Sequence, residues 1–234
     1  MKAITAHAAC TGCHACFSIC PANAISMVPD EEGFLYPIID KELCNDCNLC
    51  TNICPVNRKA EASITESDVL SEAYTSLHRD ERIRYESSSG GAFSALAETV
   101  ISHKGVVFGA RFDERFKIIH DYIETIDYLP KLRGSKYTQS EIGSCMLEVR
   151  DFLQQGRLVL FSGTPCQVEG MLSFLGKPYE NLFTVDLICH GVPSPMVWQK
   201  YLEYRKKKDG CMPEKITFRD KRLGSSYILF RLTI

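Results

Sequence analysis

Apolar and polar positions alternate regularly in the second half of the chain, and the alternation predicts helices and strands in turn. Apolar residues recur at helical spacing in residues 92–104 and again in residues 140–156, where Gly156 closes the run. Further helices are predicted at residues 168–176 and 196–210, and strands at residues 105–112, 116–124, 157–161 and 181–189. The first two strands are close enough in sequence to form a hairpin. The later alternation of strand and helix predicts an α/β domain with a mostly parallel sheet.

The first 58 residues lack this periodicity, and the composition changes again after Asn57. Residues 59–85 are polar and charged and contain neither glycine nor proline, which predicts a linker combined with a surface helix. We therefore divide the chain into residues 1–58, the linker 59–85 and an α/β domain at 86–234.

Composition narrows the class of protein. The chain has 234 residues, 12 cysteines and a formal net charge of −2. A chain of this length builds a core without cross-links, so its cysteines favour metal ligation over a disulfide framework. The charge gives no basic field for nucleic acid. The sequence contains no apolar run of roughly 18 residues, as a membrane span needs, and opens with no signal peptide. We expect a cytoplasmic protein.

Eight of the cysteines form two copies of one motif. The segments "CTGCHACFSICP" and "CNDCNLCTNICP" both read C-x2-C-x2-C-x3-C-P, the known spacing of bacterial two-cluster ferredoxins. In that arrangement three thiolates of a motif bind one [4Fe–4S] cluster and the fourth binds the other. The first cluster is then predicted to have the ligands Cys10, Cys13, Cys16 and Cys54, and the second Cys20, Cys44, Cys47 and Cys50.

The motifs predict that residues 1–58 form an α+β ferredoxin-like domain with two clusters. Structural zinc is the alternative, because paired C-x2-C units also bind Zn²⁺. Four cysteines in a row followed by proline, occurring twice, is not the usual zinc layout. His7 and His14 flank the ligands and are interpreted as bystanders, because the cysteine set is complete without them.

Two further cysteines lie at or just beyond the ends of predicted strands of the α/β domain, and the alternative to a functional role is that they are small buried apolar residues, as free cysteines often are. Cys166 and Cys189 should lie at the same edge of the sheet, because parallel strands end at one edge, where open α/β folds bind ligands. Thr164 and Pro165 predict a helix start that places Cys166 in the first turn. Cys145 is predicted to be a buried core residue. The catalytic residues stay unknown.

The loop "SSSGG" precedes the predicted helix 92–104. Main-chain N–H groups at a helix start bind phosphate, so Ser89, Gly90 and Gly91 are the candidate contacts for a phosphate-bearing cofactor. Serine and glycine also form ordinary caps and turns, which is the alternative interpretation.

The segments "RGSKYTQS", "GRLVLFSGTPCQVEGMLSFL", "ENLFTVDLICHGVPSP" and "ITFRDKRLG" resemble the coenzyme F420 hydrogenase/dehydrogenase beta-subunit family over residues 85–224. The resemblance implies an iron–sulfur oxidoreductase with FAD or FMN, and in some branches with the deazaflavin F420 as second carrier. Cys166 and Cys189 match the two loop cysteines of the family, which implies a further cluster where a later C-x-x-C follows. The chain ends at Ile234 without that region, so we expect a C-terminally truncated member.

The functional hypothesis is an oxidoreductase that relays electrons between two [4Fe–4S] clusters and a flavin- or F420-type carrier or partner. Its partner would be a redox protein or a small electron carrier. The alternative is a non-catalytic electron-carrier module on a binding scaffold that serves a partner enzyme.

Overall fold

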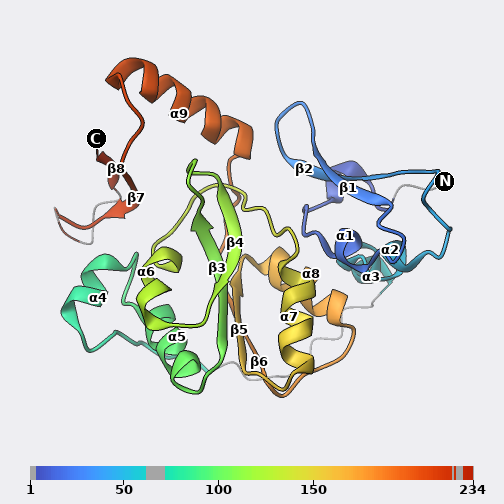
Figure 1. The fold of residues 1–234 in the computed structure, drawn as a ribbon, viewed down its shortest axis with the longest axis horizontal. Coiled ribbons are helices and arrows are strands. Elements are labelled where there is room, and N and C mark those ends of the chain that lie inside the picture. The colour runs from blue at the N-terminus through green and yellow to red at the C-terminus, as the bar shows by residue number, and fades with distance from the viewer. Residues whose placement is uncertain (1–3, 62–71, 223, 225–228, 234) are drawn as a thin grey trace.

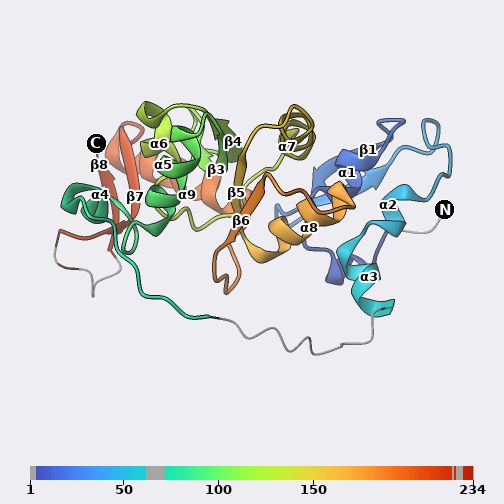
Figure 2. The same ribbon diagram turned by 90° about the horizontal axis from the view of Figure 1, so that it is seen from below.

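The computed structural model describes residues 4–61, 72–222, 224 and 229–233 (Figure 1). The cysteine-rich part lies at one end of the molecule, and a larger part built around a four-stranded sheet forms the rest (Figure 2). No helix in the described ranges is long and apolar enough to cross a membrane.

The cysteine-rich part contains three short helices and one hairpin. The hairpin pairs β1 (Ile25–Pro29) antiparallel with β2 (Leu35–Ile39). The helices and the short 3-10 turn before them are η1 (His7–Ala9), α1 (Ala15–Ile19), α2 (Leu49–Asn52) and α3 (Pro55–Glu61). Helices and strands of this kind fit the α+β prediction, while the ferredoxin-like fold itself stays a prediction.

The predicted linker is only partly described, because residues 62–71 lie outside the described ranges. Beyond them, Tyr74 and Leu77 are exposed and form no helix. The short helix α4 (Glu81–Glu86) then begins at Asp80, whose side chain accepts a hydrogen bond from the Arg82 N–H. The predicted surface helix is therefore present at the end of this segment, where it occupies only Glu81–Glu86.

The central sheet has the strand order β4–β3–β5–β6. Its strands are β3 (Val106–Phe112), β4 (Ile118–Ile123), β5 (Val159–Gly163) and β6 (Leu182–Asp186). The pairs β3–β5 and β5–β6 are parallel, whereas β3–β4 is an antiparallel hairpin. The sheet is mixed, so the α/β class is confirmed and a mostly parallel sheet is not. The reason is the short connection between Phe112 and Ile118, since so few residues can join only antiparallel strands.

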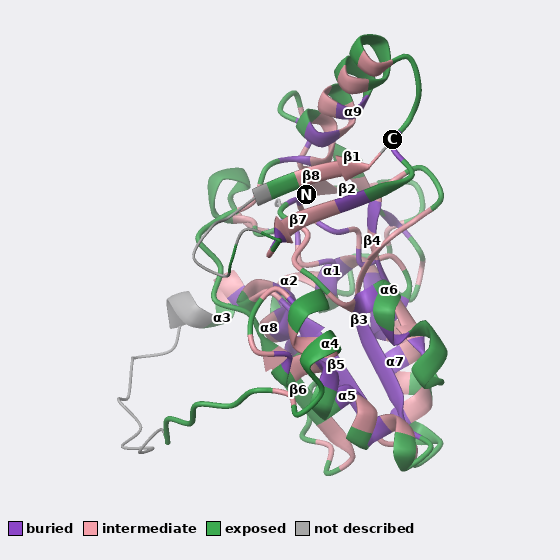
Figure 3. Ribbon diagram, turned by 90° about the vertical axis from the view of Figure 1, so that its left-hand side faces the viewer, coloured by how far each residue is buried: buried purple, intermediate pink, exposed green. Residues whose placement is uncertain are grey.

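Helices cover both faces of the sheet. On one face lie α7 (Cys145–Gln154) and α8 (Pro165–Leu175), and on the other lie α5 (Ala92–Ser102) and α6 (Leu129–Leu132), which follows the 3-10 turn η2 (Ile126–Tyr128) (Figure 1). Alternate residues of a strand point to opposite faces. Phe108 and Phe161 accordingly pack under α7 and α8, while Val107 and Leu160 pack under α5 and α6. The buried strands at the centre are visible in Figure 3.

Helix α9 (Pro195–Asp209) lies apart from this sheet and packs with a two-stranded antiparallel sheet of β7 (Lys215–Asp220) and β8 (Leu229–Thr233). Its Trp198 is buried among Phe112, Phe218 and other aromatic rings, and the indole N–H donates to the Phe116 carbonyl at 2.7 Å. The β1–β2 hairpin of the cysteine-rich part reaches the start of α9, where the Ser194 hydroxyl donates to the Glu32 carbonyl at 2.5 Å.

Strand β6 forms one edge of the central sheet. The sequence predicts a strand through Cys189, but β6 ends at Asp186 and the residues that follow are exposed. Ile188 is 93% exposed and Phe183 is 54% exposed. The apolar pattern of this segment therefore does not reflect burial within the described part of the chain.

We predict that Phe161→Ala lowers the free energy of unfolding by about 3–5 kcal/mol, because the side chain is fully buried between β3, α7 and α8. Phe183→Ala on the neighbouring strand is the matched control and should cost less than about 1 kcal/mol, since Phe183 is largely exposed. Urea unfolding followed by circular dichroism measures both. Equal losses for the two variants would contradict the assigned core.

Candidate iron–sulfur sites and the sheet edge

Four cysteine sulfurs surround a cavity in the first part of the chain. Cys10, Cys13 and Cys16 come from the first motif, and Cys54 comes from the end of the second. The rest of the wall is mainly apolar and is formed by residues that include Ile4, Ala15, Met27, Pro37 and Val56. The structure thus places Cys54 with the first three cysteines, although 38 positions separate it from Cys16.

A second cavity repeats the arrangement. Cys44, Cys47 and Cys50 of the second motif line it together with Cys20, the last cysteine of the first motif. Apolar residues again form much of the wall, among them Ala24, Ile25, Ile39 and Leu49. The eight cysteines therefore fall into the two predicted groups, and their binding of iron stays a prediction.

The backbone of the two motifs is curled in the same way. Gly12 and His14 have φ values of 63° and 66°, and the corresponding Asp46 and Asn48 have 55° and 60°. Left-handed conformations are uncommon for residues other than glycine and are enriched in His, Asp and Asn. Loops curled like this present successive N–H groups to anions and recur at Fe–S sites.

Burial determines the acidity of the sulfurs in the first cavity. Desolvation raises the pKa of Cys13 to about 11 and that of Cys16 to about 12, and it also raises the pKa of Cys10. A thiolate in this cavity is therefore unfavourable unless positive charge lies beside it. Iron supplies that charge, and metal binding to cysteine releases the proton.

The residues present fit a cluster of several metal atoms. His14 lines the first cavity, is 3% exposed, and its Nδ1 atom has no hydrogen-bond partner among the described residues. Desolvation lowers the pKa of His14 to about 4, so the ring is neutral. A group bound in the cavity would give this nitrogen a partner.

A zinc site is the alternative to a cluster in each cavity. In the described ranges, no three Cys, His, Asp or Glu side chains are arranged to hold a single metal ion. Four cysteines line each cavity, a number that suits either group, so the choice of a four-iron cube rests on the spacing of the two motifs.

A series of linked hydrogen bonds holds the edge of the sheet at the end of β5 in place. His120 Nε2 donates to the Ser162 carbonyl at 3.1 Å, because a carbonyl only accepts. The other ring nitrogen then accepts from the Ser140 hydroxyl at 2.9 Å, and the Gln167 amide donates to Ser140 at 2.9 Å. The Gln167 amide oxygen accepts from the Thr164 N–H at 2.9 Å. These bonds tie β4, β5 and the start of α8 together.

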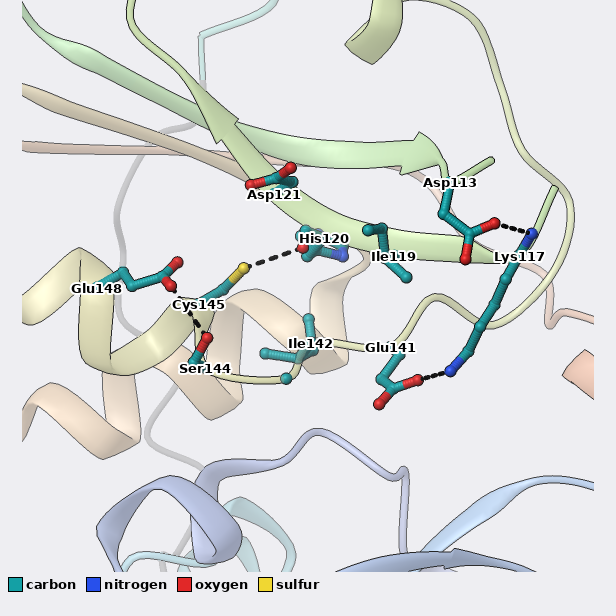
Figure 4. Close-up of a pocket in the computed structure, with 11 residues that line it drawn as sticks. Asp113, Lys117, Ile119, His120, Asp121, Glu141, Ile142, Ser144, Cys145 and Glu148 are labelled. Carbon is teal, nitrogen blue, oxygen red and sulfur yellow. Dashed lines mark hydrogen bonds and ion pairs between the residues drawn. The ribbon is translucent and has the colours of Figure 1, made fainter. Parts of the chain in front are cut away.

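Beside this network lies the polar cavity drawn in Figure 4, between β4 and the start of α7. Cys145 donates to the His120 carbonyl at 3.2 Å and is buried in the core, as predicted. Of the charged side chains in its wall, Lys117 pairs with Glu141, and Asp121 pairs with Arg111, which lies outside the wall. Side chains at this cavity are therefore already bonded to one another and hold the edge of the domain together.

Cys166 and Cys189 both follow parallel strands that end at the same edge of the sheet. Thr164 caps α8 in a capping box with Gln167, so Cys166 lies in the first helical turn as predicted, 3.2 Å from the Thr164 hydroxyl. Cys189 is exposed in the loop after β6. A further cluster involving these two thiols stays a prediction.

The candidate phosphate loop precedes α5, where Gly91 has a φ of 86°. Residues 76–78 lie against it: the His78 N–H donates to the Gly90 carbonyl at 2.7 Å. The Lys221 ammonium donates to the Ser89 carbonyl at 2.6 Å, and the Ser135 N–H donates to the Ser88 hydroxyl at 2.6 Å. The loop is thus packed by its own chain, and cofactor binding by Ser89, Gly90 and Gly91 stays a prediction.

Two known families match the chain. Residues 9–58 match a 4Fe-4S dicluster domain, and residues 156–226 match the C terminus of the coenzyme F420 hydrogenase/dehydrogenase beta subunit. The resemblance to the coenzyme F420 hydrogenase/dehydrogenase beta-subunit family is therefore confirmed over residues 156–226. A comparison with curated proteins gave no match. The two matches indicate an iron–sulfur subunit of the oxidoreductase type.

Sequence reasoning missed three residues of this region. His14 was interpreted as a bystander, yet it lies on the wall of the first cavity. His120 carried no motif. Gly170 lies so close to Cys13 that a Cβ atom there would come within 2.8 Å of its Sγ atom, and a glycine in the middle of a helix was the signal that could have drawn attention to it.

We predict that the free energy of unfolding decreases as the pH is lowered below about 6.5, the ordinary pKa of histidine. Burial lowers the pKa of His120 to about 4. Between about pH 6.5 and about pH 4, His120 is therefore protonated in the unfolded chain but neutral in the folded chain. The loss approaches about 1.4 kcal/mol per pH unit for this residue and continues until pH reaches the folded pKa. His14 contributes in the same direction.

Urea unfolding at several pH values between 7.5 and 5.5 measures the slope, which should be shallower in His120→Gln. His103→Gln, at the exposed end of α5, leaves His120 in place and is the control. An unchanged slope in His120→Gln would contradict the assignment.

Proposed function

We propose that this protein is an iron–sulfur electron-transfer subunit of an oxidoreductase that holds two [4Fe–4S] clusters near its N-terminus. The observation that carries the proposal is the pair of cavities, each lined by four cysteine sulfurs drawn from both motifs. The dicluster match over residues 9–58 and the beta-subunit match over residues 156–226 support it.

Each residue of the sites has a definite task in this proposal. Cys10, Cys13, Cys16 and Cys54 hold cluster 1, and Cys20, Cys44, Cys47 and Cys50 hold cluster 2. When bound, each cluster accepts and releases one electron at a time. The left-handed residues curl the loops, and the apolar walls limit water around the sulfurs, which is one of the factors that set a reduction potential.

The α/β domain is proposed to exchange these electrons with a carrier. FAD or FMN bound there would couple one-electron and two-electron steps, and F420 or a redox partner protein would be the second carrier. The beta-subunit match supports this part of the proposal through the family alone.

We predict about eight iron atoms and about eight labile sulfides per chain after anaerobic reconstitution. Cys54→Ala and Cys20→Ala should each leave about four, because each removes the fourth ligand of a different cluster. Electron paramagnetic resonance of the two reduced variants should then show two different remaining signals.

Cys211→Ala is the matched control, because Cys211 is exposed and lies in neither cavity. It should keep the full iron content. Zinc without labile sulfide in the wild-type chain would overturn the proposed function, and identical signals from Cys54→Ala and Cys20→Ala would overturn the grouping of the ligands.

The visible spectrum of anaerobically purified protein tests the flavin. We predict flavin bands beside the broad cluster absorbance, and FAD or FMN in the supernatant after acid precipitation. Full clusters without flavin would instead favour the electron-carrier module on a non-catalytic scaffold.

A further inference from the structure

The two cysteine cavities have different surroundings. Ala15, in the middle of the first motif, belongs to the same buried core as Phe108 and Phe161 of the central sheet, and Cys13 packs against that core. In the second motif Cys47 is exposed, and the neighbouring Leu43 is 54% exposed. The first cavity therefore adjoins the core of the α/β domain on the side of Cys13, while Cys16 and Cys54 are buried in the cysteine-rich part, and the second cavity lies nearer the surface.

Helix α8 approaches the first motif most closely at Gly170. A Cβ atom placed on this glycine would lie 2.7 Å from the Cβ atom of Cys13 and 2.8 Å from its Sγ atom. Real side chains do not approach that closely, so any other residue at 170 would displace Cys13. Glycine weakens a helix relative to alanine, and this contact supplies the reason for having it in the middle of α8.

The same helix also holds the segment that carries Cys54. Ser173 lies three residues after Gly170, on the same side of the helix. Its hydroxyl donates to the Ile53 carbonyl at 2.5 Å and accepts from the Arg58 guanidinium at 3.1 Å. Ile53 immediately precedes Cys54, so α8 contacts both chain segments whose sulfurs meet in the first cavity.

A second part of the α/β domain braces the opposite side of the first motif. The Gln139 amide oxygen accepts from the Leu35 N–H at 3.3 Å. A Cβ atom on Gly12 would lie 2.8 Å from the Gln139 Nε2 atom, so the side chain of Gln139 lies directly against the loop between Cys10 and Cys13.

We propose that α8 is a wall of the cluster 1 site and that Gly170 is a positioning residue, which lets Cys13 seat its sulfur against the helix. The inference rests on the proposed function, since it requires that the cavities hold clusters. It follows that the assembly and potential of cluster 1 depend on the α/β domain, while those of cluster 2 depend on residues 20–50. The α/β domain then acts more directly on cluster 1, through Cys13, than on cluster 2, where Ile19, the neighbour of Cys20, packs on the same core.

The physical basis is the sensitivity of a cluster to the placement of its ligands. A displaced Sγ atom changes the iron–sulfur bond and the contacts around it, and these surroundings set the reduction potential. A change on α8 should therefore reach cluster 1 selectively.

The test uses Gly170→Ala in the full chain, reconstituted with iron and sulfide and titrated anaerobically under electron paramagnetic resonance. We expect the signal assigned to cluster 1 to shift in potential and line shape, or to be lost with a fall from about eight to about four iron atoms. The cluster 2 signal should be unchanged. Cys54→Ala and Cys20→Ala, each of which removes one cluster, assign the two signals.

Gly109→Ala is the matched control. Gly109 also lies in the core of the α/β domain, but the three atoms nearest to a Cβ atom there would all belong to Leu132, at 3.6 Å or more. It adds the same methyl group without touching a cysteine, so both signals should match the wild type.

Ser173→Ala provides an independent variant that adds no volume. It removes the hydrogen bond to Ile53, and we expect a smaller change confined to cluster 1. This variant decides the question if Gly170→Ala does not give folded protein by circular dichroism.

Unchanged signals in both α8 variants, or equal shifts of both clusters, would overturn the role of α8. A wild-type chain that binds no iron would instead overturn the proposed function, so the two failures are distinguishable.

Discussion

Eight cysteine sulfurs enclosed in two largely apolar cavities impose the constraint on which the rest of the structure depends. Burial opposes thiolate formation, as the raised pKa values of Cys13 and Cys16 show. Sulfur binds metal as thiolate, so the first cavity, where these cysteines are buried, requires positive charge beside them. The curled loops with left-handed residues at positions 12, 14, 46 and 48 are the backbone arrangement that brings the sulfurs together.

Helix α8 connects the first of these cavities to the rest of the molecule. Its first turn, which contains Cys166, is fixed at the sheet edge by the capping box of Thr164 and Gln167. The network through Ser140 and His120 continues this bracing into β4. Further along the helix, one side packs on the sheet and another lies against Cys13 and Ile53. A single element thus spans the distance between the candidate ligand edge and the first cavity.

The sequence predicted those features that depend on local spacing. The two cysteine motifs indicated which cysteines share a cavity, and Thr164 and Gly210 marked ends of helices that the structure contains. Residues whose importance comes from a distant neighbour were not predictable. Gly170 is important because Cys13 packs directly against it. Whether Ile188, at the end of the predicted strand, is buried or exposed depends on which elements pack beside β6. Periodicity describes one element and carries no information on which elements meet.

The exchange of the fourth cysteine between motifs has a consequence for how the protein is made. When the ribosome has released only the first motif, one site has three of its sulfurs and the other has a single one. Under the proposed ligand assignment, the second cluster lacks a ligand until Cys50 has emerged, and the first lacks one until Cys54 has emerged. The nascent chain therefore carries exposed, reactive thiols for as long as the hairpin and second loop take to be synthesised, and protection from oxygen matters most during that interval.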